Sequence, residues 1–432
     1  MTDAAHLTAS STLVARTIAV PAEGLPDLLG LLPAPHARGA AAWVRRGEGV
    51  VGWGEAARIT TDGVDRFAAA DAAWRSLTEH MVVRDEVGLP GTGAVAFGSF
   101  SFAPDSPAGG VLVVPQIVVG RRGDAAWVTT ITAAADLVPP PTIAEIRARI
   151  APPLPAPAVE YTDGALTRRQ WRAQVAAVID LIRSASAGKV VMARDVRADL
   201  DGPLDVRRLL SNLGRDYRSC WTFAVDGLVG ATPELLVRRE RGLISSRVLA
   251  GTIQRSGDDE ADLARAASLA RSSKDLEEHE FAVDSLTRSL APFAASTNAP
   301  DAPFVLHLPN VMHLASDVTA VLAGPHAQMS SLAVAAALHP TAAVCGTPTD
   351  VAAQVIADHE QMDRARYAGP VGWIGADGDG EWGIALRSAQ VDADSRGLRL
   401  FAGCGIVAAS DPADELAESD AKLEPMRSAL AS

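Results

Sequence analysis

The 432-residue sequence predicts a mixed α/β fold, because it contains two kinds of hydrophobic pattern. Short apolar runs, such as 41–44 and 111–119, are typical of strands, whereas the apolar residues within 171–182 recur at the spacing of one helix face. The composition, 48% hydrophobic and 21% charged, is that of a globular chain with a sizeable core. No repeat of about 20 to 50 residues stands out, which argues against a solenoid.

Two proline-rich stretches, 139–141 and 151–158, form the clearest break in composition. Closely spaced prolines disfavour helix and leave an extended connection. We therefore predict an N-terminal part, 1–158, that contributes strands and helices to the fold, including a helix near 65–80, and a catalytic region, 159–432. The N-terminal part carries little recognisable chemistry.

The formal charge of −13 disfavours nonspecific binding to nucleic acid or to anionic membranes. No stretch approaches the roughly 18 apolar residues that a membrane span needs, and the first residues lack the pattern of a signal peptide. The three cysteines lie far apart in the sequence, which argues against a zinc site or a disulfide framework. These features predict a cytoplasmic protein without membrane or nucleic-acid partners, in which an anionic ligand needs a local basic pocket.

Two predicted helices begin with acidic residues three positions apart, Asp275 with Glu278 and Glu415 with Glu418. Residues at this spacing share a helix face, so each pair offers oxygen ligands side by side, and Lys422 follows the second pair by one more turn. Carboxylates from two helices suit Mg²⁺, which takes one or two of them beside waters and substrate oxygens. Solvated helix faces show the same spacing, so the pattern alone leaves both interpretations open.

Lys189 begins an apolar strand, 189–194, after a helix that starts with a capping box at 167–170 and is predicted to end at Gly188. A lysine that is desolvated at such a position has a lowered pKa and can act as a general base. The alternative is a structural lysine that interacts with the carbonyls of the helix C-terminus.

Glu234 follows Pro233 at the start of an apolar run, after a predicted strand at 221–225. Apolar surroundings raise the pKa of a carboxyl group and keep it protonated, as a general acid requires. A strand-edge glutamate that faces water is the alternative interpretation.

In the stretch 382–387, the large residues at 382, 384 and 386 alternate with Gly383, Ala385 and Arg387. Arg387 is therefore predicted on the face of a strand that carries the small residues, where there is room for a ligand carboxylate. A structural ion pair is the usual alternative for a strand arginine. Gly403 and Gly405 lie where the backbone could approach a ligand and donate N–H groups, or where the chain merely bends. Among the histidines, His313 and His339 are the two to follow, with a core or turn position as the default.

In their order along the chain, the motifs of residues 160–430 resemble those of the chorismate-utilising enzymes, most closely isochorismate synthases. The resemblance lies in Lys189-Val-Val-Met-Ala-Arg, Ala-Thr-Pro-Glu234-Leu-Leu, Leu-Ala-Gly251-Thr252, Lys-Asp-Leu-Glu-Glu278-His, His-Pro-Thr-Ala-Ala343-Val-Cys-Gly, Tyr367-Ala-Gly-Pro-Val-Gly-Trp and Gly-Cys-Gly-Ile-Val with the acidic helix start that follows it. It implies the α/β (α+β) fold of anthranilate synthase component I, with two antiparallel β-sheets packed as a sandwich and helices outside.

The resemblance implies a Mg²⁺-dependent isomerase that converts chorismate to isochorismate by adding water at C2 while the C4 hydroxyl leaves. In this scheme Lys189 corresponds to the base that activates water, and Glu234 corresponds to the acid that protonates the leaving hydroxyl.

The implied metal ligands are Glu278 and Glu418. Asp275 and Glu415 would hold metal-bound waters or adjust the ligands, although many relatives carry glutamate in place of Asp275. The residues that the resemblance assigns to substrate binding are Gly251, Thr252, Ala343, Tyr367, Arg387, Gly403, Gly405 and Lys422.

Three positions select the reaction within the family. Lys189 stands where ammonia-adding relatives carry glutamine, which implies water as the nucleophile and no amidotransferase partner. Ala250 replaces the nucleophilic lysine of aminodeoxychorismate synthases. Ala343 stands where salicylate synthases and other members carry threonine, which favours isochorismate as the end product.

A salicylate synthase, which also eliminates pyruvate, is the first alternative, and a noncatalytic chorismate- or metal-binding module is the second. The protein is expected to act as a monomer, in either menaquinone or siderophore biosynthesis.

Overall fold

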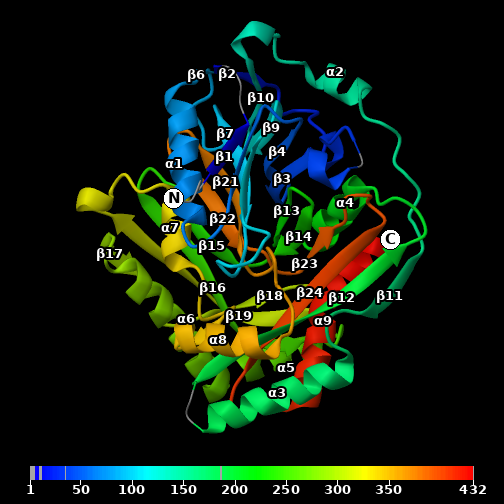
Figure 1. Cartoon of the computed structure of the whole chain (residues 1–432), viewed down its shortest axis with the longest axis vertical. Helices are drawn as coiled ribbons and strands as arrows, with labels where there is room; N and C mark the ends of the chain where they lie inside the picture. Colours follow the sequence, from blue (N-terminus) through cyan, green and yellow to red (C-terminus); the bar gives the residue numbers. More distant parts are fainter. Residues whose placement is uncertain (1–4, 9–11, 35, 185–186, 432) are drawn as a thin grey trace.

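The computed structural model describes residues 5–8, 12–34, 36–184 and 187–431. Within them, two large β-sheets pack face to face and helices cover their outer faces (Figure 1). This arrangement confirms the predicted sandwich. Paired strands are antiparallel, apart from β2 (Leu13–Val20) and β6 (Val82–Asp85), which run parallel.

The first sheet has eleven strands among the described residues. In spatial order they are β1 (Ala5–Thr8), β5 (Ala57–Thr61), β8 (Gly110–Val114), β7 (Val95–Phe100), β21 (Pro370–Gly375), β22 (Gly380–Ile384), β15 (Leu235–Glu240), β16 (Leu243–Gln254), β19 (Val311–Leu322) and β17 (Ala294–Asn298), with β18 (Phe304–His307) also paired to β19.

The second sheet has thirteen strands in the described part of the chain. In spatial order they are β11 (Val159–Asp163), β12 (Lys189–Leu200), β24 (Gly397–Ile406), β23 (Ser388–Val391), β14 (Leu228–Thr232), β13 (Trp221–Val225), β3 (Ala40–Arg45), β4 (Glu48–Trp53), β9 (Ile117–Arg122), β10 (Ala125–Ala133), β2 and β6, with β20 (Gly346–Thr347) also paired to β12. Each sheet contains strands from both sides of residue 158.

The core between the sheets is formed by the residues of each strand that point inward. Along β3, Trp43 faces the first sheet, whereas Ala42 and Val44 face the opposite way. Trp43 stacks on Trp221 of β13 with ring centroids 6.2 Å apart, and it shares one buried cluster with Phe97 of β7. The period-two alternation therefore supplies both layers of packing.

Helices α1 (Arg66–Glu79), α6 (Ser273–Leu290) and α7 (Ser331–Leu338) pack on the first sheet, and α4 (Val206–Asp216) and α9 (Pro412–Ala431) pack on the second. Helix α3 (Arg168–Arg183) contacts β12 and α9, α8 (Thr349–His359) contacts β12, and α5 (Asp259–Leu269) contacts β16. Helix α2 (Ile143–Ala148) lies between the proline-rich stretches, and short 3₁₀ helices span Leu28–Leu31, Ala37–Gly39, Ala134–Asp136 and Gly324–His326.

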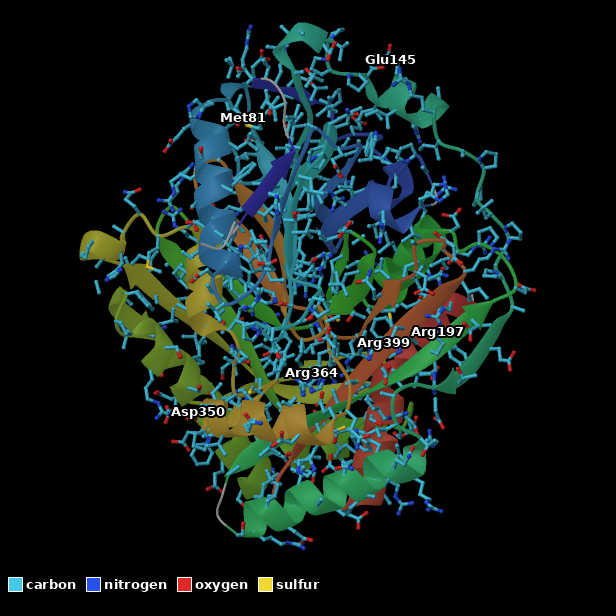
Figure 2. The ribbon with its side chains drawn as sticks, in the orientation of Figure 1. Met81, Glu145, Arg197, Asp350, Arg364 and Arg399 are labelled. Atoms are coloured by element: carbon cyan, nitrogen blue, oxygen red, sulfur yellow. The ribbon has the colours of Figure 1, made fainter. Side chains whose placement is uncertain are left out.

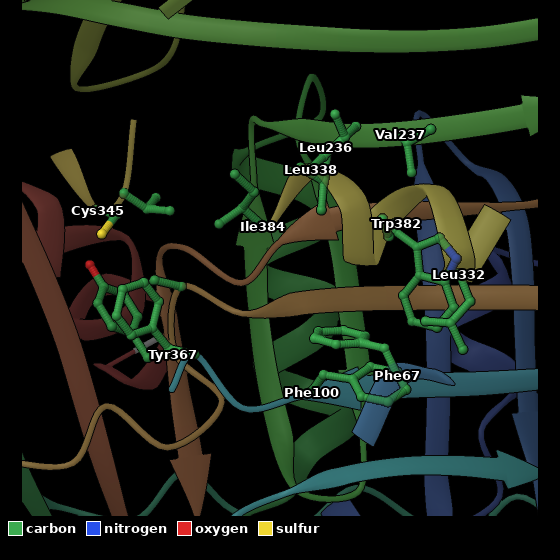
Figure 3. Packing of buried hydrophobic residues seen from close by; sticks show 14 of the residues in the cluster. Phe67, Phe100, Leu236, Val237, Leu332, Leu338, Cys345, Tyr367, Trp382 and Ile384 are labelled. Atoms are coloured by element: carbon green, nitrogen blue, oxygen red, sulfur yellow. The ribbon is translucent and has the colours of Figure 1, made fainter. Parts of the chain in front are cut away.

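Figure 3 shows how the helices close one face of the first sheet. Phe67 of α1 stacks on Phe100 of β7 with ring centroids 4.6 Å apart, and Phe100 meets the edge of Trp382 from β22. Leu332 of α7 belongs to the same buried cluster. Aromatic rings of this size bury large apolar areas, which holds α1 and α7 on the sheet.

The pairing of β12 with β24 carries the chain towards its C-terminal helix. Residues 190–199 of β12 pair with 406–397 of β24, and the partners Arg197 and Arg399 lie near each other in Figure 2. The chain leaves β24 and enters α9 after a short connection. The start of β12 therefore lies beside the end of β24, a few residues before α9 begins.

The prediction of a single strand over 111–119 was wrong. This stretch forms β8 and β9, which belong to different sheets. Pro115 has no N–H to donate to a ladder, and the N–H of Gln116 donates to the carbonyl of Trp53 at 3.1 Å. The chain therefore crosses between the sheets at this proline.

The capping box of α3 is confirmed, because the side chains of Thr167 and Gln170 accept from each other's backbone N–H groups. The predicted end of this helix at Gly188 was wrong, because α3 ends at Arg183. The hydroxyl of Ser184 donates to the carbonyl of Leu181 at 2.7 Å and competes with further helical bonds. No helix within the described ranges is both long and apolar enough to cross a membrane.

Replacing Phe97 by Ala should destabilise the fold strongly, because this ring is fully buried between the sheets. We expect the free energy of unfolding to fall by about 3–5 kcal/mol, as measured by urea denaturation. Val64→Ala is the control, since Val64 is 76% exposed and its truncation should change the same quantity by about 0.5 kcal/mol or less. Equal losses in the two variants would contradict the proposed core.

Candidate active site

One cavity gathers the predicted site residues. It is lined by all of those whose side chains are described, namely Lys189, Glu234, Gly251, Thr252, Asp275, Ala343, Tyr367, Arg387, Gly403, Gly405, Glu415, Glu418 and Lys422. They come from both sheets, from α6 and α9, and from the connecting segments that contain Glu234, Ala343, Tyr367 and Arg387. The backbone of Glu278 belongs to α6, but its side chain lies outside the described residues.

Lys189 is the first residue of β12, and the backbone around it is held on both sides. Val190 pairs with Ile406 of β24, and Lys189 pairs with Thr347 of β20. The N–H of Gly188 donates to the carbonyl of Thr347 at 2.9 Å. These pairings hold the backbone at the point from which the lysine side chain enters the cavity.

Glu234 lies where the chain passes from β14 in the second sheet to β15 in the first. Its N–H donates to Oγ1 of Thr232 at 3.2 Å, and its carbonyl accepts from the N–H of Ile384 at 3.2 Å. The side chain is 5% exposed, and burial raises its pKa to about 8, although Lys189 and Lys422 act to lower it. The carboxyl group is therefore protonated at neutral pH and can donate a proton.

Arg387 is buried in the cavity wall, but its predicted place within a strand was wrong. Strand β22 ends at Ile384, and Arg387 lies in the connection to β23 with a φ of 49°. This left-handed backbone is unusual for a residue with a side chain, and it turns the chain sharply before β23. Arg387 is 7% exposed, and among the described residues its Nη1 has no hydrogen-bond partner. A buried guanidinium with an open donor is suited to a ligand carboxylate.

His313 of β19 connects Arg387 with Thr252. Its Nε2 lies 3.5 Å from Nη2 of Arg387, and its Nδ1 lies 3.0 Å from Oγ1 of Thr252. Burial, together with Arg387 and Lys422, lowers the pKa of His313 well below its usual value, so the ring is neutral. Gly251, with a φ of 76°, lies at the bulge in β16 that brings Thr252 opposite His313.

The acidic residues at the start of α9 form a compact cluster at one end of the cavity. The ligand atoms of Cys404, Glu415 and Glu418 all lie within 4.8 Å of one another. The hydroxyl of Ser410 donates to Oε1 of Glu415 at 2.7 Å. Glu418 and Asp275, from α9 and α6, both reach the cavity. Carboxylate oxygens from two elements fit the ligand preference of Mg²⁺.

The cationic side chains of Lys189, Arg387 and Lys422 in the cavity wall offset its carboxylates. Nζ of Lys422 lies 2.6 Å from Oε1 of Glu418 and donates to the carbonyl of Gly403 at 3.0 Å. Burial alone would lower the pKa of Lys422, but the adjacent Glu418 outweighs burial and raises it. An acidic protein thus has a local basic site for an anion.

Tyr367 presents a neutral hydroxyl to the same cavity. Burial raises its pKa to about 12, so it remains protonated and can donate a hydrogen bond. Its ring stacks on Phe401 of β24 with centroids 5.1 Å apart and an interplanar angle of 9°. The stacking restricts the direction of the hydroxyl group.

The sequence interpretation missed Arg364, Leu386 and Phe401, which also line the cavity. Leu386 and Phe401 adjoin residues that had been singled out, so proximity in sequence was the available signal. Arg364 follows Glu360 by four positions, which is ion-pair spacing on a helix but is common on solvated surfaces.

A sequence model of the family described as "Chorismate binding enzyme" matches residues 35–431. The isochorismate synthase DhbC of Bacillus subtilis is 39% identical over 260 residues, which are 58% of this chain, and the chain spans 64% of that relative. The salicylate biosynthesis isochorismate synthase of Pseudomonas aeruginosa is 34% identical over 400 residues, which cover 88% of this chain and 82% of the relative.

Solved structures of similar proteins share the fold. The menaquinone-specific isochorismate synthase MenF from Escherichia coli superposes with a TM-score of 0.79 and 25% sequence identity, over 98% of this chain and 95% of that one. A putative 2,3-dihydroxybenzoate-specific isochorismate synthase, DhbC from Bacillus anthracis, gives a TM-score of 0.75 and 29% identity, over 93% and 98%.

Replacing Glu234 by Gln should make the fold more stable at high pH. The folded protein keeps the Glu234 proton up to a pKa of about 8, whereas the unfolded chain loses it near 4.5. The stability that wild type has at acid pH is therefore lost as the pH rises from 4.5 to 8, and Gln removes this loss. Between pH 6 and pH 8, we expect the variant to gain on the order of 2 kcal/mol relative to wild type in urea denaturation.

The exposed Glu424→Gln is the matched control and should show no such pH-dependent gain. A constant difference between Glu234→Gln and wild type at the two pH values would show that Glu234 is ionised in the folded protein.

Proposed function

The chain belongs to the chorismate binding enzyme family, and within it we propose that this protein is an isochorismate synthase, an isomerase that converts chorismate to isochorismate. The observation that carries the proposal is one cavity that contains both Lys189 and a protonated Glu234. Water addition with loss of a hydroxyl group needs both a base and an acid, and these two side chains supply them.

Lys189 is proposed to take a proton from the water that attacks C2 of the ring. Glu234 is proposed to give its proton to the C4 hydroxyl as that group leaves. The raised pKa of Glu234 supports this assignment, because only the protonated form can donate. Burial of the Glu234 carboxyl group limits its proton exchange with bulk water while the reaction proceeds.

Substrate binding is proposed to rest on groups that can pair with the two carboxylates of chorismate. The open Nη1 of Arg387 supports a direct bond to one carboxylate. Lys422 and the Tyr367 hydroxyl are further donors on the cavity wall, and the neutral His313 orients Arg387 and Thr252. The remaining proposed contacts come from the backbone and small side chains of Gly251, Ala343, Gly403 and Gly405.

Magnesium is proposed as the cofactor. Glu418 and Glu278 would hold the ion, with Asp275 and Glu415 placed to hold its waters or adjust its ligands. The support from the described residues is that Asp275 of α6 and Glu415 and Glu418 of α9 all line the cavity, with the ligand atoms of Glu415 and Glu418 within 4.8 Å of each other. When bound, Mg²⁺ neutralises and anchors a substrate carboxylate.

Isochorismate is proposed as the end product because alanine occupies two positions of the cavity wall at which family members with other reactions carry different residues. Ala343 stands where a threonine favours the lyase, and Ala250 leaves no amine to attack the substrate. Lys189 supports water as the nucleophile, so no amidotransferase partner is proposed. We propose that the enzyme acts in the cytoplasm as a monomer. Isochorismate synthases occur among both the menaquinone-specific and the salicylate-biosynthesis relatives, so either kind of pathway could use the product.

Chromatography of the products formed from chorismate and Mg²⁺ tests the function. We expect wild type to form isochorismate without salicylate or pyruvate, and Lys189→Gln to lose at least about 100-fold in turnover, because the amide cannot accept the proton. Arg183→Gln, at the exposed end of α3, is the control and should retain wild-type turnover. Salicylate with pyruvate would support the lyase instead, and chorismate binding without any product would refute the enzyme proposal.

Glu418→Gln should weaken the response to Mg²⁺, because an amide oxygen is a poorer ligand than a carboxylate. We expect the Mg²⁺ concentration for half-maximal turnover to rise by about tenfold or more. Glu424→Gln, on the same helix but exposed, should leave this concentration unchanged. An unaltered Mg²⁺ response in Glu418→Gln would remove Glu418 from the proposed ligand set.

A further inference from the structure

A buried ion pair joins Glu360 to Arg364, which lines the cavity. Their side chains are 1% and 3% exposed. Glu360 caps the C-terminus of α8, and Figure 2 shows Arg364 near the middle of the molecule, close to this helix. Two opposite charges this far from water are costly to bury unless their hydrogen-bonding groups are satisfied.

The guanidinium of Arg364 makes contacts in three directions. Its Nε donates to Oε2 of Glu360 at 2.9 Å, and its Nη2 donates to the other carboxylate oxygen. Nη1 donates to the carbonyl of Val344 at 2.8 Å, and Nη2 also donates to the carbonyl of Val191 at 2.7 Å. The planar fork of arginine can make these bonds at once, which a lysine ammonium cannot.

The carboxylate of Glu360 adds a bond to the same strand. Its Oε1 accepts from the N–H of Ala193 at 2.6 Å. Val191 and Ala193 follow Lys189 by two and four positions in β12, and Val344 adjoins Ala343 in the cavity wall. The ion pair therefore joins the strand of the proposed base to the segment that contains Ala343.

These contacts fill a gap in the second sheet. On the edge of β12 that faces away from β24, β20 pairs with residues 189–190 and β11 pairs with 196–200. The intervening N–H of Val191 donates to the carbonyl of Cys345 at 2.8 Å, and the carbonyl of Ala193 accepts from Nε1 of Trp171 at 2.9 Å. Side chains and a loop thus replace a missing strand, since buried backbone groups require partners.

The same segment also reaches the substrate side of the cavity. The N–H of Tyr367 donates to the carbonyl of Arg364 at 3.0 Å. Burial would lower the pKa of Arg364, but Glu360 outweighs burial and raises it, so the guanidinium stays charged. The Glu360–Arg364 ion pair, together with the backbone of Arg364, thus connects three parts of the cavity wall: β12, the Ala343 segment and Tyr367.

We propose that Glu360 and Arg364 are positioning residues that hold the Lys189 end of β12 at a set separation from the Ala343 segment during water addition. This inference rests on the proposed isochorismate synthase function. It concerns the chemical step, because in the described part of the chain the Glu360 and Arg364 side chains form no hydrogen bond or ion pair with the proposed carboxylate-binding groups Arg387, Lys422 and the Tyr367 hydroxyl.

Arg364→Lys tests the proposal, because it keeps the positive charge but removes the fork. We expect kcat for isochorismate formation to fall by about tenfold or more, since small displacements of reacting groups are costly, while KM for chorismate changes by less than about threefold. A structural role alone would not produce this division between kcat and KM.

Arg207→Lys is the matched control. Arg207 is also buried, its fork pairs with Asp205, and it donates to the carbonyls of Ala151 and Pro152 at 2.9 and 3.2 Å, but it does not line the cavity. We expect this variant to lose stability in urea denaturation and to keep kcat within about twofold of wild type.

Equal losses of kcat in Arg364→Lys and Arg207→Lys, or a loss confined to KM, would overturn the positioning role. If Arg364→Lys does not fold, Glu360→Gln gives the same decision: it keeps an acceptor for Ala193 but removes the charge, and should lower kcat with KM unchanged. A wild-type protein that forms no isochorismate would instead refute the proposed function, so the two failures are distinguishable.

Discussion

The antiparallel pairing of β12 with β24 is the contact on which the rest of the site depends. It pairs Val190 and Val191, which follow Lys189, with Ile406 and Gly405. After a short connection, β24 is followed by the helix that carries Glu415 and Glu418. A slip of one residue would turn every side chain of β12 to the opposite face. The register of this pair, with the side chains that complete the outer edge of β12, therefore decides which groups enter the cavity.

Desolvation gives the ionisable groups of the cavity different states. Burial keeps Glu234 protonated and His313 neutral, whereas Lys422 keeps its charge because Glu418 lies beside it. Arg387 is buried with a donor that no described residue satisfies. A protein of net charge −13 thereby offers a cavity with a proton to donate and cations to bind an anion.

The sequence was sufficient to locate most of the candidate site, because each of these residues belongs to a short motif that can be recognised from the residues next to it. The orientation of those groups was less accessible: Arg387 was expected in a strand and lies in a turn with a φ of 49°. Arg364 was missed because its partners, the carbonyls of Val191 and Val344, are 173 and 20 residues away in the chain. Nothing in the local pattern around Arg364 distinguishes it from an exposed arginine.

The sequence by itself determined the features that depend on near neighbours. The capping box at Thr167 and the strand Trp221–Val225 follow from residues within a few positions of one another. Tertiary structure alone decided the crossing between sheets at Pro115, the raised pKa of Glu234 and the bridge made by Arg364. The physical reason is that burial and long-range hydrogen bonds exist only once both sheets have packed, whereas caps and periodic patterns are properties of a single segment.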